Sequence, residues 1–193
     1  MNNLEQSSNA TSLTLIEKVR AADQNAWHRI VLIYSPLLFH WGQRARIESS
    51  SIQDIVQEVW QAVWKKIGSF ERTTESGSFR AWLWTITRNR IIDHCRKKAN
   101  QHEIALTEHV LNLNQLLPET EPEEENEAVD QGIIHRTLEM IREDFNEATW
   151  KAFWRTTIDG ISAADAGAEL GMNANAVYQA KSRVLRRLRE ELA

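Results

Sequence analysis

Apolar residues recur at helical spacing along most of the chain, and no stretch shows the sustained alternation of a β-strand. Pro36 is a good first residue for a helix, because a helix start needs no N–H there. The strongest amphipathic pattern lies between residues 52 and 67, at Ile52, Ile55, Val56, Val59, Trp60, Val63 and Ile67. The spacing predicts an all-α fold with helices over 13–33, 36–47, 52–67, 79–98, 127–145, 147–159, 162–170 and 174–191.

The helical pattern fails between residues 100 and 126. This stretch contains Pro118 and Pro122, and residues 119–130 hold seven acidic residues and no basic one. Such a composition is typical of a flexible segment. The sequence therefore predicts two small helical domains joined by an acidic flexible linker. The predicted boundaries are a polar N-terminal tail at 1–12, a first domain at 13–99, the linker at 100–126 and a second domain at 127–193.

The formal net charge of −4 conceals two basic stretches. Residues 80–98 hold six basic residues against Asp93 alone, and residues 174–193 hold five basic residues against two acidic ones. Clustered Lys and Arg are the electrostatic signature of a nucleic-acid surface, whatever the overall charge. The charge pattern therefore favours two DNA-binding patches, one in each predicted domain.

The last third of the chain has the signals of a helix-turn-helix. Ser162 and Asn173 are good N-caps for two successive helices, Asp165 suits the first turn of the first, and Gly171 suits its end. In a helix-turn-helix the second helix enters the major groove of DNA. The alternative is an ordinary two-helix hairpin with a solvated basic face.

Other features exclude function classes. Cys95 is the only cysteine, so no internal disulfide forms; its neighbours His94, Arg96 and Lys97 would lower the pKa of the thiol, but an ordinary helix residue is the favoured interpretation. The six histidines are scattered without metal-ligand spacing, and no phosphate-binding loop or nucleophile motif is present. We expect no metal, no cofactor and no enzymatic activity. No apolar run spans a bilayer and the N-terminus is no signal peptide, so a cytoplasmic protein is expected.

Three motifs together resemble a known family. They are DIVQEVWQAVWKKIGSFE at 54–71, GSFRAWLWTITRNRIIDHCRKK at 77–98 and the helix-turn-helix at 160–192. In this order the chain resembles bacterial RNA polymerase sigma factors of the extracytoplasmic-function (ECF) group of the sigma-70 family. The resemblance covers about 13–98 and 127–192. It implies an alternative sigma factor that binds core RNA polymerase and directs promoter-specific transcription initiation, with 13–99 as region 2 and 127–193 as region 4.

The resemblance also implies positions for the contacts of region 2. The helix that docks on the β′ clamp coiled coil of the polymerase would use Asp54, Gln57, Glu58, Trp60, Gln61 and Trp64. Whether Trp60 is a contact or a core residue stays open, since i, i+4 aromatic pairs are often core. The minus-ten promoter element would be held and melted by Phe70, Thr85, Arg88, Asn89, Arg90, Arg96 and Lys97. The loop before the second motif is longer than in compact members, which leaves the accepted base open.

In region 4 the resemblance implies a reader of the minus-thirty-five element. Its residues would be Asn175, Tyr178, Gln179, Ser182, Arg183 and Arg186, with Arg183 on phosphate. Tyr178 and Gln179 depart from the basic or small residues common there, which points to a different promoter. Ala166-Gly167 also departs from the family and predicts close backbone packing. Trp150, Phe153 and Trp154 are expected in the core, with part of that surface available to the polymerase β flap.

Promoter DNA and core polymerase are the implied partners, with an anti-sigma factor as a further candidate. The alternative function is a stand-alone helix-turn-helix transcription regulator that binds DNA as a dimer. The motif at 54–71 has no role in such a regulator, and no dimerisation heptad is evident.

Overall fold

The computed structural model describes residues 14–70, 79–101, 117–120 and 127–192, and all regular structure within them is helical. This confirms the all-α prediction for the described part of the chain. The chain divides into two compact units, Val19–Ile133 and Ile134–Ala193 with Met1–Lys18. The α-helices are α1 (Leu15–Arg20), α2 (Gln24–Arg44), α3 (Ser49–Lys66), α4 (Phe79–Gln101), α6 (Glu127–Ile141), α7 (Glu147–Thr157), α8 (Ala163–Leu170) and α9 (Ala174–Leu192). Two 3₁₀ turns, η1 (Ile67–Ser69) and η2 (Arg142–Asp144), follow α3 and α6.

The first helices differ from the prediction. The predicted helix is interrupted at Ala22, which has a left-handed φ of 59°. Asp23 then caps the start of α2, because its carboxylate accepts hydrogen bonds from the N–H groups of Asn25 and Ala26 at 2.8 and 3.0 Å. The predicted boundary at Pro36 is wrong, because Pro36 lies inside α2. A proline costs the helix one backbone hydrogen bond. The helix nevertheless continues because the residues on both sides of Pro36 are buried along one face, at Ile30, Ile33, Leu37, Leu38 and Trp41.

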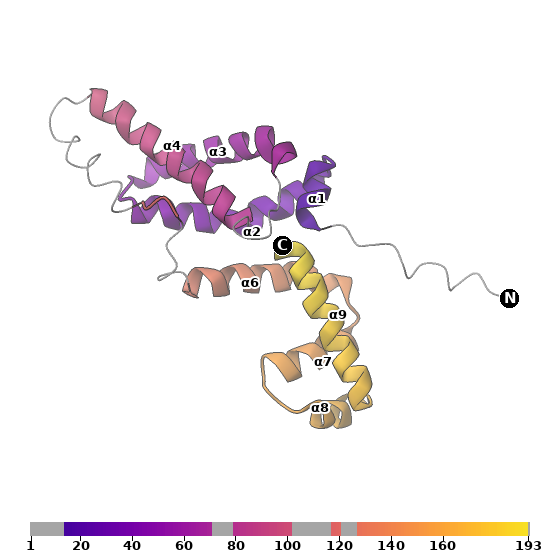
Figure 1. The fold of residues 1–193 in the computed structure, drawn as a ribbon. Helices are drawn as coiled ribbons and strands as arrows, with labels where there is room; N and C mark the ends of the chain where they lie inside the picture. Colours follow the sequence, from indigo (N-terminus) through magenta and orange to yellow (C-terminus); the bar gives the residue numbers. More distant parts are fainter. Residues whose placement is uncertain (1–13, 71–78, 102–116, 121–126, 193) are drawn as a thin grey trace. The chain divides into compact units, whose positions relative to one another are not determined.

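The larger unit is built on α2, α3 and α4, which lie side by side (Figure 1). Trp41 and Trp84 are 1% exposed and meet edge to face, with ring centroids 4.9 Å apart. A methyl group at Gly42 would lie 3.1 Å from Ile52, so α2 and α3 pack closely at this point. Of the two tryptophans two residues apart in α4, Trp84 is fully buried and Trp82 is half-buried, because residues at this spacing point to different faces of a helix.

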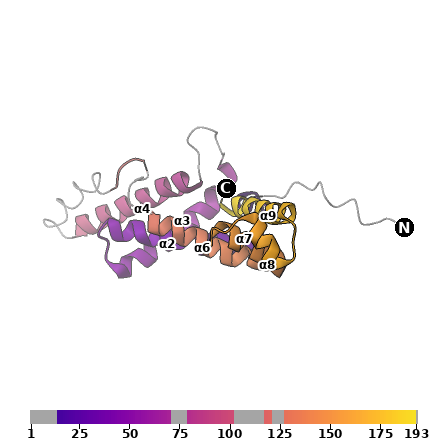
Figure 2. The same cartoon turned by 90° about the horizontal axis from the view of Figure 1, so that it is seen from below.

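In the smaller unit, α7, α8 and α9 pack together (Figure 2). One buried group joins Leu138, Ile141, Phe153 and Val184, with Trp150 and Trp154 packed against it. A second joins Ala152, Ala166, Val177 and Ala180 beneath the tight turn between α8 and α9. The predicted core role of Trp150, Phe153 and Trp154 is confirmed.

The turn between α8 and α9 has the predicted caps. The Ser162 hydroxyl accepts from the Asp165 N–H at 3.1 Å, and the Asn173 side chain accepts from the Ala176 N–H at 2.8 Å. Gly171 ends α8 with a left-handed φ of 65°, a conformation that glycine adopts without strain. Close backbone packing at Gly167 is also confirmed, and the backbone that lies against Gly167 is that of the turn between α8 and α9. A methyl group there would lie 2.5 Å from the carbonyl oxygen of Met172.

Replacing Gly167 with alanine should therefore destabilise the smaller unit. The new methyl group has to displace backbone atoms of the turn, and we expect a loss of about 1–3 kcal/mol in the free energy of unfolding. The measurement is denaturant unfolding followed by circular dichroism. Gly68→Ala is the control, because a methyl group at Gly68 meets nothing within 4 Å and its effect should stay within about 0.5 kcal/mol. Equal stability of the two variants would contradict the close approach.

Candidate nucleic-acid and protein interfaces

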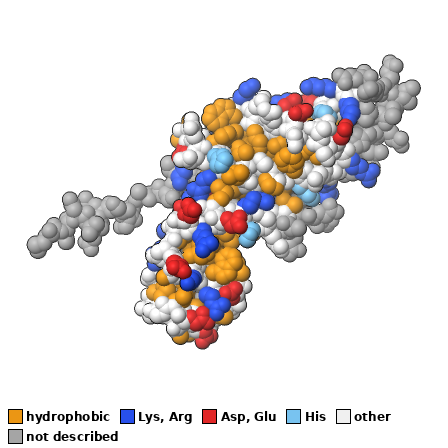
Figure 3. Space-filling view, turned by 180° about the vertical axis from the view of Figure 1, so that it is seen from behind, with side chains coloured by type: hydrophobic (Ala, Val, Ile, Leu, Met, Phe, Trp, Pro, Cys, Tyr) orange, Lys and Arg blue, Asp and Glu red, His pale blue; other side chains and the backbone are white. Residues whose placement is uncertain are grey.

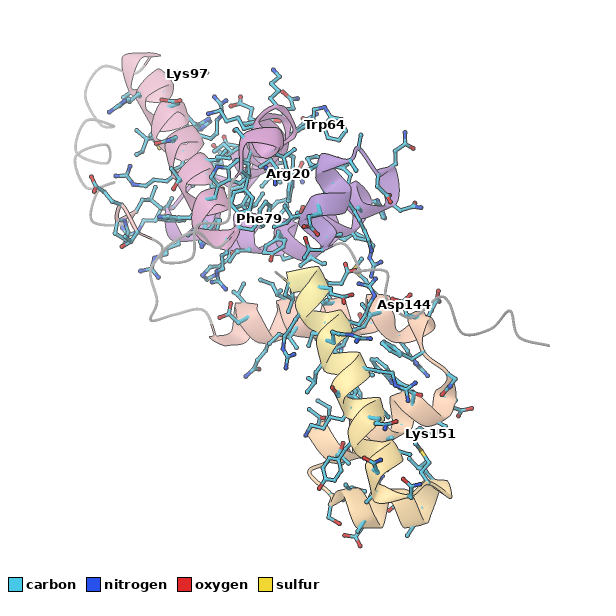
Figure 4. All side chains as sticks on the ribbon, turned by 45° about the vertical axis from the view of Figure 1, so that its right-hand side comes forward. Arg20, Trp64, Phe79, Lys97, Asp144 and Lys151 are labelled. Carbon is cyan, nitrogen blue, oxygen red and sulfur yellow. The ribbon has the colours of Figure 1, made fainter. Side chains whose placement is uncertain are left out.

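A groove with a volume of about 770 Å³ runs between α2 and α3 and is lined with tryptophan. Trp27 of α2 meets Trp64 and Trp60 of α3 edge to face, at centroid distances of 4.9 and 5.7 Å. The Trp60 indole N–H donates to the Ser35 hydroxyl at 3.0 Å, which fixes the floor of the groove. Trp64 is 50% exposed at its rim, near the end of α3 (Figure 4). Figure 3 shows hydrophobic side chains reaching the surface of this unit.

The outer face of α3 presents most of the predicted docking residues together. Five of the six are exposed, and they follow helical spacing at Asp54, Gln57, Glu58, Gln61 and Trp64. Trp60 is only 7% exposed and has its polar atom satisfied inside the unit, so it supports the groove from beneath. A polar strip beside an exposed aromatic residue is the composition of a protein interface.

Sequence reasoning missed the contribution of α2 to this groove. Trp27, His28 and Val31 line it from α2, together with Gln24. The signal was the i, i+4 pair Trp27 and Val31, which lies beside the core stripe of Ala26 and Ile30. The pattern within one helix does not show which neighbouring helix its half-buried residues face, so the α2 pattern alone does not predict this second edge of the groove.

Of the residues predicted for the minus-ten element, the Phe70 side chain is buried, and the others are exposed or half-buried along α4. Phe70 is 4% exposed and packs on Phe79 and Trp82, with centroid distances of 5.8 and 5.1 Å. Phe79, labelled in Figure 4, stands at the start of α4. The loop at 71–78 lies outside the described residues. Along α4 the exposed members are Thr85, Asn89, Arg96 and Lys97, and the half-buried ones are Arg88 and Arg90.

Several basic side chains of α4 are held by partners within the larger unit. Arg80 pairs with Asp130, and Lys98 pairs with Glu48 at 3.3 Å. Arg88 donates through Nε to the carbonyl oxygen of Leu117 at 2.9 Å. Arg96 and Lys97 are exposed near the end of the helix, where Figure 4 labels Lys97. The basic stretch is therefore partly a structural network and partly an exposed surface.

The environment of Cys95 corrects one sequence expectation. The basic neighbours were expected to lower the pKa of the thiol, yet burial raises it, and Lys98 opposes that effect only partly. The side chain is 4% exposed. Desolvation disfavours the charged thiolate, so burial outweighs the nearby positive charge. Cys95 is a packed residue of α4.

The helix α9 separates its two faces as predicted. Val177, Ala180 and Val184 are fully buried against α7 and α8. The predicted DNA-reading residues are all exposed, at Asn175, Tyr178, Gln179, Ser182, Arg183 and Arg186. Tyr178 is 63% exposed, an unusual position for an aromatic side chain with no packing role. The described helix therefore offers a continuous polar and basic face beyond a capped turn.

Arg187 has a different role from the outward arginines of α9. It donates to Asp144 at 2.8 Å and also pairs with Glu191, whose side chain is almost fully buried. Burial acts to lower the pKa of Arg187, but Glu191 and Asp144 outweigh it and raise that pKa. Asp144 follows α6 in the η2 turn (Figure 4), so the network ties α9 to the end of α6. No local pattern predicts this network, because 43 residues separate Asp144 from Arg187.

A bidentate ion pair joins α7 to α8. Arg155 donates to the two carboxylate oxygens of Glu169 at 2.9 and 2.8 Å, and to Asp159 at 2.8 Å. The hydrogen bonds from Arg155 lower the pKa of Glu169 below its ordinary value of 4.5. This contribution to stability is present above that value and is lost as the pH falls through the lower folded-state pKa. The pair is exposed and orients α8 more than it stabilises the unit.

A second groove, with a volume of about 360 Å³, lies between α6 and α7. Leu138, Trp150 and Trp154 supply its apolar lining, and charged side chains from both helices, including Lys151 (Figure 4), surround it. The two tryptophan rings are 6.0 Å apart. They serve the core on one side and remain partly exposed on the other, so this surface can also receive an apolar side chain of a partner.

The described residues contain no group of His, Cys, Asp or Glu that could hold a metal ion. Among the described helices, none combines the length and the apolar character needed to cross a membrane.

Comparison with known proteins gives consistent matches. The model of Sigma-70 region 2 matches residues 30–101. The ECF RNA polymerase sigma factor BldN of Streptomyces coelicolor is 24% identical over 183 residues, covering 94% of this chain and 66% of BldN. The ECF sigma factor SigL of Mycobacterium tuberculosis is 25% identical over 159 residues, covering 81% of this chain and 82% of SigL. SigW of Bacillus subtilis is 30% identical over 106 residues, covering 53% of this chain and 55% of SigW.

Proposed function

The chain belongs to the sigma-70 family as an RNA polymerase sigma factor of the ECF group, and from this premise we propose which of its surfaces bind polymerase and which read DNA. As an ECF sigma factor it directs transcription initiation with RNA polymerase and is not an enzyme. The observation that carries the assignment of surfaces is the face of α9, where six consecutive outward positions are polar or basic and exposed. The proposed domains are 13–99, which holds all but the last two of the residues 30–101 matched by Sigma-70 region 2, and 127–193, which contains the helix-turn-helix.

The outer face of α3 docks on the β′ clamp coiled coil of the polymerase. The support is its exposed strip of Asp54, Gln57, Glu58 and Gln61 beside Trp64, with Trp60 as a fixed floor. An aromatic side chain at a groove rim is the kind of residue that dominates binding energy at protein interfaces. The acidic members would complement basic residues on the partner and set the orientation of docking.

The exposed face of α4 holds one strand of the minus-ten element. Thr85 and Asn89 are exposed one turn apart, and Phe70 packs with Phe79 and Trp82 near the start of the same helix. Reading a base that has left the duplex requires hydrogen bonds to its edge and an apolar wall. Arg90, Arg96 and Lys97 supply phosphate contacts, which give affinity more than sequence preference, whereas Arg88 is engaged by the carbonyl oxygen of Leu117.

The face of α9 reads the minus-thirty-five element in the major groove. Gln179 has the two hydrogen-bonding atoms that pair with adenine, and Tyr178 is placed for a thymine methyl or a phosphate. Arg183 and Arg186, with Asn175 and Ser182, complete the contact surface. The groove at Trp150 and Trp154 binds the β flap, supported by its partly exposed aromatic lining. An anti-sigma factor is a further proposed partner that would compete for the same faces.

Gln179→Ala should alter sequence preference more than overall affinity. Loss of a bidentate contact removes about 1–3 kcal/mol of discrimination at one base pair. Arg183→Ala is the matched comparison, because loss of a phosphate contact should weaken binding to all sequences about equally. The measurement is binding of the polymerase complex to promoters varied one position at a time in the minus-thirty-five element. A uniform loss for Gln179→Ala would contradict a base-reading role.

The proposed polymerase contact is tested by co-purification with core RNA polymerase at physiological salt. We expect a stable complex in the absence of DNA, since the α3 face is preformed. The alternative, a regulator that binds DNA alone, predicts no complex with core polymerase. Failure to bind polymerase, together with binding of a palindromic DNA site as a dimer, would overturn the proposal.

A further inference from the structure

Arg187 joins the C-terminal half of α9 to the turn η2 through two different carboxylates. Its Nε donates to Asp144 at 2.8 Å, and its Nη1 pairs with Glu191, one turn further along α9. The side chain of Glu191 is 1% exposed, which is unusual for a carboxylate. Because Glu191 lies within α9, it orients the Arg187 side chain along the helix. Asp144 lies outside α9 and makes the connection to η2.

The turn that carries Asp144 is itself held in place. The next residue, Phe145, packs against the buried group that joins α6, α7 and α9. Its ring also stacks on that of Trp150, with the centroids 6.5 Å apart. The side chain of Asn146 accepts from the N–H of Thr149 at 2.8 Å and caps α7. The Asp144 carboxylate is therefore attached to a fixed part of the smaller unit, and Arg187 ties α9 to it.

The Arg187 network lies beside the proposed DNA-reading face of α9. Arg186 is the adjacent residue and Arg183 lies one turn earlier, and both are exposed. These two arginines share the walls of one polar depression with Arg187 and Asp144. Gln179 lies one turn before Arg183. The places that these side chains reach on DNA depend on the rotation and tilt of α9, and recognition requires such a helix to be held by its own supporting hydrogen bonds.

The ionic character of the network supports a role in orientation. Replacing a buried ion pair with apolar residues of similar size is often neutral or stabilising, so stability alone does not explain a buried carboxylate at Glu191. The planar guanidinium of Arg187 directs its N–H groups at two carboxylates in fixed directions, which an apolar side chain or a lysine does not do. The network therefore adds a directional constraint to the apolar packing of Val184 on the buried side of α9.

We propose that Arg187 is a positioning residue for recognition of the minus-thirty-five element. Its bonds to Asp144 and Glu191 hold α9 at the rotation in which Gln179 reaches a base edge. The inference rests on the proposed function, in which the face of α9 reads this element. Arg187 acts through that face and does not itself contact DNA.

Asp144→Ala tests the connection to η2 and leaves the pair of Arg187 and Glu191 within α9. The Asp144 side chain is 41% exposed, so the variant should fold. The measurement is the affinity of the polymerase complex for promoters with the minus-thirty-five element selected from a randomised library, relative to that element with one base pair changed. This affinity ratio should fall roughly threefold to tenfold. Glu143→Ala is the matched control, because it removes the same charge from an exposed position of the same turn, and its ratio should stay within about twofold.

Coupling to Gln179 separates positioning from general stabilisation. If the network positions Gln179, then Gln179→Ala should lower the affinity ratio much less in the Asp144→Ala chain than in the unaltered chain. Equal reductions in the two chains would overturn the proposal. An Asp144→Ala ratio as high as that of Glu143→Ala would also overturn it. An unaltered complex with no preference among minus-thirty-five sequences would contradict the proposed function instead.

A second variant, Arg187→Met with Glu191→Leu, replaces the buried ion pair with apolar side chains. We expect its thermal unfolding midpoint to match or exceed that of the unaltered chain, while its affinity ratio falls by the same threefold to tenfold. A retained ratio in this variant would show that apolar packing alone orients α9 and would overturn the proposal. If the double variant does not fold, the coupling between Asp144→Ala and Gln179→Ala decides the matter alone.

Discussion

Trp64→Ala should cost this protein most of its proposed affinity for core RNA polymerase while leaving the fold intact. Trp64 is 50% exposed at the rim of the α2–α3 groove, and its ring meets Trp27 at 4.9 Å. Truncation of an aromatic residue at the centre of an interface costs about 2–4 kcal/mol, which corresponds to roughly 30-fold to 1,000-fold in the dissociation constant. The measurement is titration of the variant with core polymerase in the absence of DNA.

Leu32→Ala is the matched control for Trp64→Ala. Leu32 is also a large apolar side chain of the same unit, 47% exposed, yet it does not line the groove. We expect its affinity for polymerase to stay within about threefold of the unaltered protein, as for a neutral surface change. If both variants bind equally well, the groove is not the docking site. If both lose affinity equally, general loss of exposed apolar surface explains the effect.

Asn89→Ala should damage promoter opening without affecting polymerase binding. Asn89 is exposed on α4 one turn from Thr85, on the helix whose Trp82 packs against Phe70. A bidentate contact to a base edge is worth about 1–3 kcal/mol, so open-complex formation should fall by roughly 5-fold to 150-fold. Permanganate reactivity of unpaired thymines reports the opening, and co-purification reports polymerase binding.

Gln43→Ala serves as the control for Asn89→Ala, because it removes an exposed amide side chain from α2, a helix that supplies none of the residues proposed for the minus-ten element. It should leave both readouts unchanged. Equal loss of opening and of polymerase binding in Asn89→Ala would point to misfolding, and full opening activity would remove Asn89 from the minus-ten surface.

Local chemistry explains why the sequence predicts the helix-turn-helix well. Ser162, Gly171 and Asn173 act on backbone groups within three or four residues of themselves, so their caps follow from the sequence alone. Amphipathic spacing likewise predicts the buried and exposed faces of α9. Confirmed features of this kind depend on short-range interactions or on a strong hydrophobic period.

Long-range packing explains where the sequence misleads. A proline at 36 suggests a helix start, but burial on both sides of it carries α2 through. Ala22 has a left-handed φ, a conformation that alanine rarely adopts and that the neighbouring residues do not predict. The pKa of Cys95 depends on burial that the fold creates, and the Leu117 carbonyl finds its donor in Arg88, 29 residues away. The docking groove itself needs α2 beside α3, which no single helix pattern contains.

The most direct test of the central claim is run-off transcription by purified core RNA polymerase on a library of randomised promoters. If the α4 and α9 faces read two elements, transcripts should require the chain and should select two sequence motifs at a narrow range of spacings. Gln179→Ala should change the upstream motif alone, and Asn89→Ala should reduce initiation from every selected promoter. Chain-dependent transcription that selects only one motif, or selection unaltered by Gln179→Ala and Asn89→Ala together, would contradict the account of a two-point promoter reader.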